Sequence, residues 1–120
     1  MSKKTLVLGA SDNPNRYSYH AITRLIANNH EVRAIGNKLG EIDGVTISTI
    51  QEKFNDIDTV TIYLNKKHQH KYYDYIIGLK PKRVLFNPGT QNIEFEKLLT
   101  KNNIAFERAC TLVLLSINQY

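Results

Sequence analysis

The chain has 120 residues, 42% of them hydrophobic and 22% charged, which is ordinary for one soluble globular domain. These values exclude a disordered tail, a collagen-like fibre and a disulfide-stabilised scaffold. Cys110 is the one cysteine, so no intrachain disulfide can form, which favours a reducing cytoplasm. The formal net charge is +5, but the basic residues are scattered rather than arranged in a stripe, so we expect no nucleic-acid partner.

The apolar runs are too short for a membrane protein. The longest purely aliphatic run, Leu112–Leu115, falls far below the roughly 20 apolar residues that cross a bilayer. The first five residues lead directly into a short apolar strand instead of the hydrophobic region of a signal peptide. We therefore expect a cytoplasmic protein without a membrane partner.

The first half of the chain predicts two buried strands, one helix and a less regular segment. Thr5–Ala10 is a short apolar strand, and turn-forming residues separate it from a helix over Tyr17–Asn29 with apolar side chains at helical spacing. A second strand is predicted at Glu31–Gly36. The segment that follows predicts a loop over Asn37–Gly44, a short edge strand over Val45–Ser48 and a brief helix over Thr49–Asn55.

The second half continues the alternation of β-branched runs and helical patterns. Asn92 is positioned to cap one of these helices. In chain order we expect a strand over Thr59–Leu64, a helix over Lys67–Leu79, a strand over Arg83–Phe86, a helix from Asn92 to about Asn103, a strand over Ile104–Phe106 and a final helix over Thr111–Tyr120.

Strands that alternate with helices of 10–15 residues predict an α/β fold. We expect one Rossmann-like domain over residues 1–120, with three α/β/α layers around a mainly parallel sheet of about five strands. Right-handed crossovers place helices on both faces of such a sheet, and ligands bind at the carboxyl ends of its strands. The loops after Ala10, Gly36, Leu64 and Phe86 should therefore line one edge.

The first of these loops has the chemistry of a diphosphate site. Gly9 permits a close approach of the backbone, Ser11 adds a hydroxyl donor and Arg16 adds a guanidinium suited to phosphate oxygens. The following helix directs its free N–H groups at the same place. In the alternative interpretation, Gly9 only ends a strand and Arg16 is a solvated charge. The dinucleotide fingerprint G-x-G-x-x-G is not met.

The second loop discriminates between nucleotides. An NAD site has an acidic residue after the second strand, which accepts from the ribose 2′-hydroxyl, whereas this chain has Lys38. A lysine there argues against NAD and for a nucleotide with an extra ribose phosphate, which means NADP or coenzyme A. The alternative is that Lys38 is a surface loop lysine.

Several short motifs follow one another along nearly the whole chain. They are Leu8-Gly-Ala-Ser11 with Pro14, Arg16 and Ser18-Tyr19, then Asn37-Lys38, Glu41-Ile-Asp-Gly44, Asp58 before the strand Val60–Leu64, and Arg108-Ala-Cys110. In this order they resemble the small stand-alone CoA-binding domain family, which is similar to the N-terminal domain of the succinyl-CoA synthetase alpha subunit.

The resemblance implies a protein that binds coenzyme A or an acyl-CoA. By this resemblance Gly9, Ala10 and Ser11 meet the diphosphate, flanked by Arg16 and Tyr19, and Lys38 reaches the ribose phosphate. The adenine and ribose pocket is implied at Gly36, Asn37, Tyr63, Leu64 and Asn65. Two positions depart from the pattern, since many relatives have Asn-Pro where this chain has Gly36-Asn37, and many have a proline where it has Thr111.

The residues indicate no catalytic group and no metal site. His68 and His70 would lie on different faces of a helix, with no cysteine or carboxylate cluster nearby; His68 either contacts a ligand phosphate or ribose or is a partly exposed histidine. Cys110 is either a nucleophile at a helix start or a buried small hydrophobe. We therefore expect a non-catalytic or regulatory binding protein.

Other hypotheses stay open at this point. An NADP-binding oxidoreductase-like protein would share the fold and the basic loop, and a protein-interaction module could keep the fold without a ligand. Tyr72, Tyr73 and Tyr75 crowd one predicted helix, so they either form a patch for a homodimer or are ordinary half-exposed tyrosines.

Overall fold

The structure is a computed structural model that describes residues 2–120. These residues form a single sheet with the strand order β3-β4-β2-β1-β5-β6-β7. Every pair of neighbouring strands is parallel except β3 and β4. The strands are β1 (Thr5–Ala10), β2 (Val32–Gly36), β3 (Gly40–Ile42), β4 (Val45–Ser48), β5 (Thr59–Ile62), β6 (Arg83–Phe86) and β7 (Ala105–Arg108).

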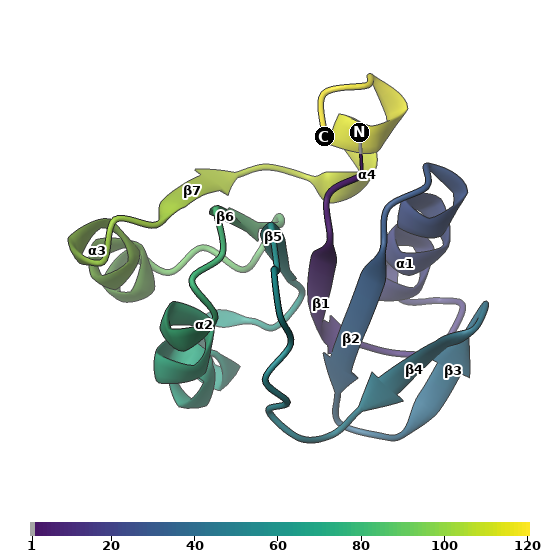
Figure 1. Ribbon diagram of the computed structural model, residues 1–120, viewed down its shortest axis with the longest axis horizontal. Coiled ribbons are helices and arrows are strands. Elements are labelled where there is room, and N and C mark those ends of the chain that lie inside the picture. The colour runs from purple at the N-terminus through teal and green to yellow at the C-terminus, as the bar shows by residue number, and fades with distance from the viewer. Residues whose placement is uncertain (1) are drawn as a thin grey trace.

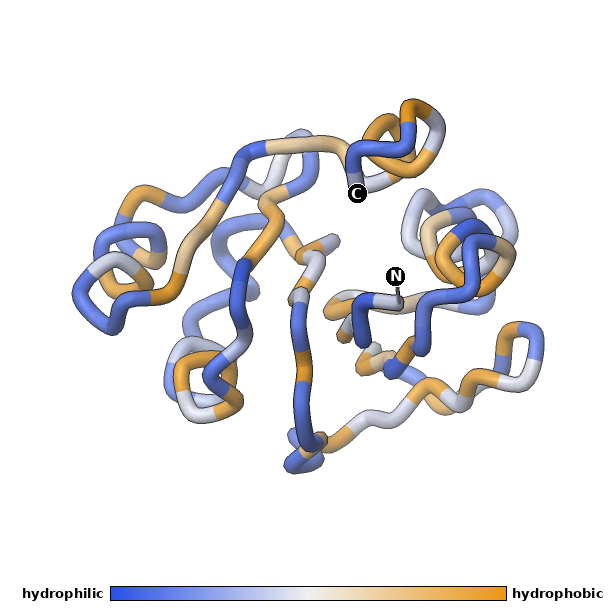
Figure 2. The backbone as a smooth tube through the Cα atoms, turned by 45° about the horizontal axis from the view of Figure 1, so that its top comes forward, coloured by the Kyte–Doolittle hydropathy of each residue, from blue (hydrophilic) through white to orange (hydrophobic). Residues whose placement is uncertain are grey.

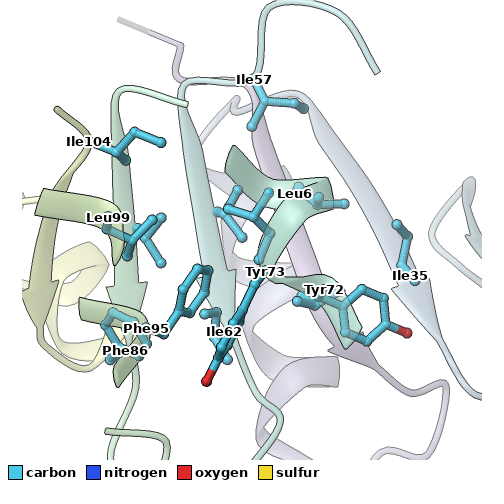
Figure 3. Close-up of a cluster of buried hydrophobic side chains, with 14 residues drawn as sticks. Leu6, Ile35, Ile57, Ile62, Tyr72, Tyr73, Phe86, Phe95, Leu99 and Ile104 are labelled. Carbon is cyan, nitrogen blue, oxygen red and sulfur yellow. The ribbon is translucent and has the colours of Figure 1, made fainter. Parts of the chain in front are cut away.

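Helices cover both faces of the sheet (Figure 1). They are α1 (Tyr17–Ala27), α2 (Tyr73–Leu79), α3 (Ile93–Lys101) and α4 (Thr111–Ser116), with two 3-10 turns, η1 (Lys66–His68) and η2 (His70–Tyr72). Helices α2 and α3 pack on one face, where Tyr73 and Phe95 stack against each other (Figure 3), and α1 and α4 pack on the other. The structure confirms a Rossmann-like α/β fold with a mainly parallel sheet, but the sheet has seven strands rather than about five.

Each helix carries both hydrophobic and hydrophilic residues (Figure 2), as helices do that pack one face on a sheet. The apolar face of α1 is formed by Ala21, Ile22 and Leu25, which are all fully buried. Of the three tyrosines beside α2, Tyr72 and Tyr73 are buried and Tyr75 is half-buried. Two of these rings therefore belong to the core, and the homodimer stays a prediction.

The segment predicted as the loop Asn37–Gly44 contains strand β3, which the sequence analysis missed. Asp43 and Gly44 both have positive φ, 47° and 87°, and join Ile42 to its pairing partner Val45. This two-residue Asp-Gly connection is the turn that a tight hairpin prefers. Because β3 pairs on the outer side of β4, the prediction that Val45–Ser48 is an edge strand is wrong.

The helix predicted over Thr49–Asn55 is absent, because that segment is an irregular connection. It leads from the carboxyl end of β4 to the amino end of β5, back along the length of the sheet. A helix rises about 1.5 Å per residue, whereas an extended chain rises about 3.3 Å, so these residues cover that length more readily as an extended connection than as a helix. Ser48 also competes with helix formation, since its hydroxyl accepts from the backbone N–H of Ile50 at 3.2 Å.

Three predicted helices run too far because asparagines end them early. Asn29, Asn103 and Asn118 have φ values of 66°, 60° and 57°, and each follows the end of a helix as the left-handed residue that asparagine tolerates. After α4, for example, the N–H of Gln119 donates to the carbonyl of Leu114 at 2.8 Å. The last helix therefore ends at Ser116 instead of continuing to residue 120, and the first ends at residue 27.

The segment predicted as one helix over Lys67–Leu79 begins with the turns η1 and η2 and becomes α-helical only at Tyr73. The amide of Gln69, between the two turns, donates to the carbonyls of Leu64 at 2.9 Å and Thr90 at 2.7 Å. These contacts direct the side chain of Gln69 into the protein, where it is buried. The start of the predicted helix is thus replaced by tighter turns tied to neighbouring loops.

The strand predicted over Ile104–Phe106 is shifted slightly, to residues 105–108.

The two ends of the chain meet beside the amino ends of the strands (Figure 1). The hydroxyl groups of Tyr120 and Thr5 lie 2.6 Å apart, and the Tyr120 ring lies between His30, with ring centroids 4.9 Å apart, and the Arg83 guanidinium, 4.5 Å from the ring centroid. The backbone N–H of Lys3 donates to His30 Nδ1 at 2.9 Å. His30 therefore acts as an acceptor, which requires its neutral form.

We expect the free energy of unfolding to fall as the pH drops below about 6.5, because the folded chain disfavours protonated His30. Burial, followed by the charges of Lys3 and Arg83, lowers the pKa of His30 below its ordinary value of 6.5. The unfolded chain therefore binds this proton more tightly than the folded chain. The resulting loss in the free energy of unfolding should stay below about 1 kcal/mol, because solvent screens the charges around a partly exposed ring. Urea titrations from about pH 5 to pH 7.5 should show a steeper pH dependence for the wild type than for His30→Gln. Equal slopes in the two proteins would contradict this assignment.

Candidate functional site

The strand order reverses at β1. From β1 the chain builds β2, β4 and β3 on one side, and after residue 58 it builds β5, β6 and β7 on the other. In open parallel sheets this reversal opens a crevice at the carboxyl ends of the strands, where ligands bind. The carboxyl ends of β1 and β2 point away from the two chain ends (Figure 1). The candidate site is therefore the edge formed by the loops after β1, β2 and β5.

Glycines let the three loops approach one another closely. Gly9 has a φ of 93°, and a Cβ atom there would lie 2.9 Å from the carbonyl carbon of Tyr63. A Cβ atom at Gly36 would lie 2.1 Å from the carbonyl oxygen of Ala10, and one at Gly40 would lie 2.7 Å from the Asp12 carboxylate. The absence of a side chain at Gly36 thus permits the close contact between the ends of β1 and β2.

The amino end of α1 offers unpaired backbone donors at this edge. Arg16 precedes the helix, no side chain caps it, and its first turn contains no acidic residue. By contrast, Asn92 caps α3 by accepting from the N–H of Phe95 at 3.1 Å, and Glu94 and Glu96 lie in its first turn. Because a helix amino end attracts anions, α1 is open to an anionic group and α3 is already satisfied by its own residues.

The side chains around α1 complement its positive end. Ser11 is half-buried, and its hydroxyl oxygen accepts from the N–H of Asn13 at 3.1 Å, which leaves its O–H free to donate. Arg16 and Lys38 are exposed, and neither forms an ion pair within residues 2–120. Tyr19 is half-buried and packs against the core between the sheet and α1. Arg16 beside the helix end and Lys38 after β2 are thus unpaired cations within the described residues, and Ser11 keeps a hydroxyl donor.

Two of the three residues predicted for the site after β5 have side chains that pack into the core. The side chain of Tyr63 packs into the core beside α1 and α4, and Leu64 packs into the core on the opposite face of the sheet. The Tyr63 hydroxyl is buried close to Thr61 and Thr111, and burial raises the pKa of Tyr63 well above its usual range. Of the three predicted residues in this loop, only Asn65 has an exposed side chain, together with Asn37 after β2.

A buried polar network beneath the site escaped the sequence analysis, apart from the cap at Asn92. Asn87 donates to Thr61 Oγ1 at 2.6 Å and accepts from the N–H of Thr111 at 2.9 Å. Asn92 donates to Gln69 Oε1 at 3.0 Å, and Gln69 donates to the loops on both sides of it. The network thus joins β5 and η1–η2 to the starts of α3 and α4. Clusters of Asn, Gln and Thr at strand ends are the signal that could have revealed it.

An open hollow of about 490 Å³ lies between the loops that follow β5 and β6. Buried Tyr73 and exposed Gly89 both line it, and most of its charged lining residues are basic. The lining residues are Asn65, Lys66, Lys67, His70, Tyr73, Gly89 and Glu94. Asn65, which is also one of the residues predicted for the nucleotide site, lines this hollow.

Two further residues singled out in the sequence, His68 and Cys110, differ in exposure. His68 is exposed at the end of η1. Cys110 is half-buried immediately before α4 and close to Tyr63. Across the described part of the chain, no three His, Cys, Asp or Glu side chains are grouped to hold a metal ion. No helix within residues 2–120 has the length and apolar character needed to cross a membrane.

Comparisons with known proteins agree with this architecture. A family model described as CoA binding domain matches residues 3–116. A crystal structure of an uncharacterized protein is 47% identical, with a TM-score of 0.97, and the match covers 100% of this chain and 99% of that chain. No curated protein matches the chain.

Two solved archaeal structures share the fold at lower identity. A hypothetical protein from Pyrococcus horikoshii OT3 is 23% identical, with a TM-score of 0.81 over 93% of this chain and 80% of that chain. A conserved hypothetical protein from Pyrococcus furiosus is also 23% identical, with a TM-score of 0.79 over 92% of this chain and 98% of that chain.

Proposed function

Because the chain belongs to the CoA-binding domain family, we propose that it binds coenzyme A or an acyl-CoA at the carboxyl ends of β1, β2 and β5. The observation that carries this proposal is the amino end of α1, which has no side-chain cap and no acidic residue in its first turn. Ser11 and Arg16 precede this helix, and Lys38 follows β2 at the same edge of the sheet. Backbone N–H groups, a hydroxyl and two cations suit a ligand with several phosphate groups.

The diphosphate fits the loop after β1. Gly9 brings the backbone close to Tyr63 after β5, Ala10 lies against Gly36 at the end of β2, and Ser11 keeps a free O–H. Arg16 and Tyr19 would flank the diphosphate, where the guanidinium can make paired hydrogen bonds to its oxygens. The contrast with α3, whose amino end is occupied by its own asparagine and glutamates, supports α1 as the phosphate-binding helix.

The adenosine end fits the loops after β2 and β5. Lys38 would hold the phosphate on the ribose, and Gly36 and Asn37 would border the base. Tyr63 and Leu64 would contribute backbone and the packing beneath the base, while the exposed amide of Asn65 is free to bond to the ribose. These assignments make the recognition of the ribose phosphate the property that distinguishes this site from an NAD site.

We propose a binding or regulatory role without catalysis. Ser11 has the backbone N–H of Asn13 as its partner rather than a histidine, so no base activates its hydroxyl for acyl transfer. A protein of this kind would sense or carry a CoA derivative. Calorimetric titration with CoA and with NADPH separates this proposal from an NADP-binding oxidoreductase-like protein, since only CoA should bind. Binding of neither nucleotide would favour a protein-interaction module.

Lys38→Ala is expected to weaken binding of CoA about fivefold. The substitution removes an exposed ion pair between Lys38 and the ribose phosphate, and such a pair contributes about 1 kcal/mol to the binding free energy. Dephospho-CoA lacks that phosphate, so its affinity should change by less than about twofold. Lys53→Ala, which also removes one exposed lysine, is the matched control and should leave both affinities unchanged. Equal losses for CoA and dephospho-CoA in Lys38→Ala would remove Lys38 from the ribose phosphate.

A further inference from the structure

The hollow between the loops after β5 and β6 is not used by the nucleotide contacts proposed above, apart from Asn65. Lys66, Lys67 and His70 lie on its rim, and the one acidic lining residue is Glu94. Both lysines are exposed, and within residues 2–120 neither forms an ion pair. The hollow is therefore a basic surface whose charges are not neutralised by the protein.

The surroundings of the hollow are held in place. Tyr73 lines it, and the centroid of the Tyr73 ring lies 5.0 Å from that of the His70 ring. The Tyr73 hydroxyl accepts from Asn92 at 2.7 Å and lies 3.5 Å from the Glu94 carboxylate. Buried Gln69 ties the loop on one side to Thr90 on the other. A ligand group that enters the hollow would thus meet a preformed wall and adjustable lysines at the rim.

The strand order determines which end of a bound CoA reaches this hollow. With the ribose phosphate at Lys38 after β2 and the diphosphate at Ser11 after β1, the rest of the ligand extends toward β5 and β6. Neighbouring strands are about 4.8 Å apart, so the loops after β5 and β6 are the next surface along the edge. The pantetheine arm and its thiol or acyl end therefore lie on the side of the hollow.

We propose that this hollow selects acyl-CoA molecules whose acyl group ends in a carboxylate. The inference rests on the proposed function, since it assumes a bound CoA moiety. Lys66 and Lys67 would pair with the carboxylate, and the imidazole of His70 would donate a hydrogen bond to it. A neutral acyl chain would leave these cations unpaired, so the protein would discriminate by charge at the far end of the acyl group.

Calorimetric titration with pairs of acyl-CoA molecules tests this directly. Malonyl-CoA and acetoacetyl-CoA differ by a methyl group in place of one carboxylate oxygen, and glutaryl-CoA and hexanoyl-CoA form a longer pair. We expect the anionic member of at least one pair to bind about fivefold more tightly or better, as partly exposed ion pairs allow. The variant Lys66→Gln/Lys67→Gln should abolish this preference and change the affinity for free CoA by less than about twofold.

The double variant Lys97→Gln/Lys101→Gln removes two exposed charges from α3 and is the matched control, which should keep the preference. Equal affinities within both pairs would overturn the inference, and so would a preference that survives Lys66→Gln/Lys67→Gln. If that variant weakened free CoA and every acyl-CoA equally, the hollow would hold a phosphate of CoA instead, which also overturns it. Failure of CoA itself to bind the wild type would refute the proposed function, a result distinct from all of these.

Discussion

Gly36→Ala is expected to lower the free energy of unfolding by about 3 kcal/mol, the upper range for forcing an atom into a packed interior. The added methyl carbon would lie 2.1 Å from the carbonyl oxygen of Ala10. Ala10 and Gly36 are paired in register between β1 and β2, so relief of the clash requires the two backbones to separate. Because they separate at the proposed diphosphate site, we expect CoA binding by the folded fraction to weaken as well.

Gly78→Ala provides the control for this substitution. Gly78 lies in α2, and a Cβ atom there would have no neighbour within 4 Å. Alanine in a helix is favoured over glycine by about 0.5–1 kcal/mol, so this variant should be slightly more stable than the wild type. Urea unfolding followed by circular dichroism measures both variants. A Gly36→Ala protein as stable as the wild type would show that the close approach of β1 and β2 is not a constraint.

Asn87→Ala should lower the free energy of unfolding by about 3 kcal/mol, because it leaves buried groups without hydrogen-bond partners. The Asn87 amide donates to Thr61 Oγ1 at 2.6 Å and to the Ile62 carbonyl at 2.9 Å. Its oxygen accepts from the N–H of Thr111 at 2.9 Å. Alanine supplies none of these contacts and also creates a small cavity between β5, β6 and α4.

Asn102→Ala is the control for this prediction, because it makes the same substitution at an exposed position. The Asn102 amide donates to the Leu98 carbonyl at 2.8 Å at the end of α3, where water can replace it. We therefore expect a loss within about 0.5 kcal/mol. Chemical unfolding of the two variants under the same conditions gives the comparison. Similar losses at positions 87 and 102 would show that the buried network adds nothing beyond a surface hydrogen bond.

Most of the fold could be predicted from local patterns in the sequence. Short β-branched and apolar runs predict β1, β2, β5 and β6, because such residues pack on both faces of a buried parallel sheet. Asn92 identifies the start of α3 through a bond to the backbone three residues later. These signals involve residues close together in the chain, so they need no knowledge of the surrounding structure. The Asp43-Gly44 turn and the asparagines that end helices are equally local signals, so β3 and the ends of α1, α3 and α4 could also have been predicted from the sequence.

The candidate site divides in the same way. That Gly9, Ser11, Arg16 and Lys38 share one edge follows from the rule that carboxyl ends of parallel strands lie together. The same rule does not predict that the Tyr63 side chain points into the core. That direction depends on packing against α4, which begins almost 50 residues later in the chain. The buried bonds of Gln69 and Asn87 likewise join loops that are distant in sequence.

By itself, the sequence determined the α/β alternation and the edge of the sheet to which Ser11, Arg16 and Lys38 belong, and it led to the proposal of a nucleotide with a ribose phosphate. These depend on residue type and on spacing along the chain. Only the tertiary structure decided that Gly36 must lack a side chain, that residues 49–55 are not helical and that Lys66, Lys67 and His70 border one hollow. Each of these depends on which backbone or loop lies opposite in space, and that is set when distant strands pair and the helices pack on both faces of the sheet.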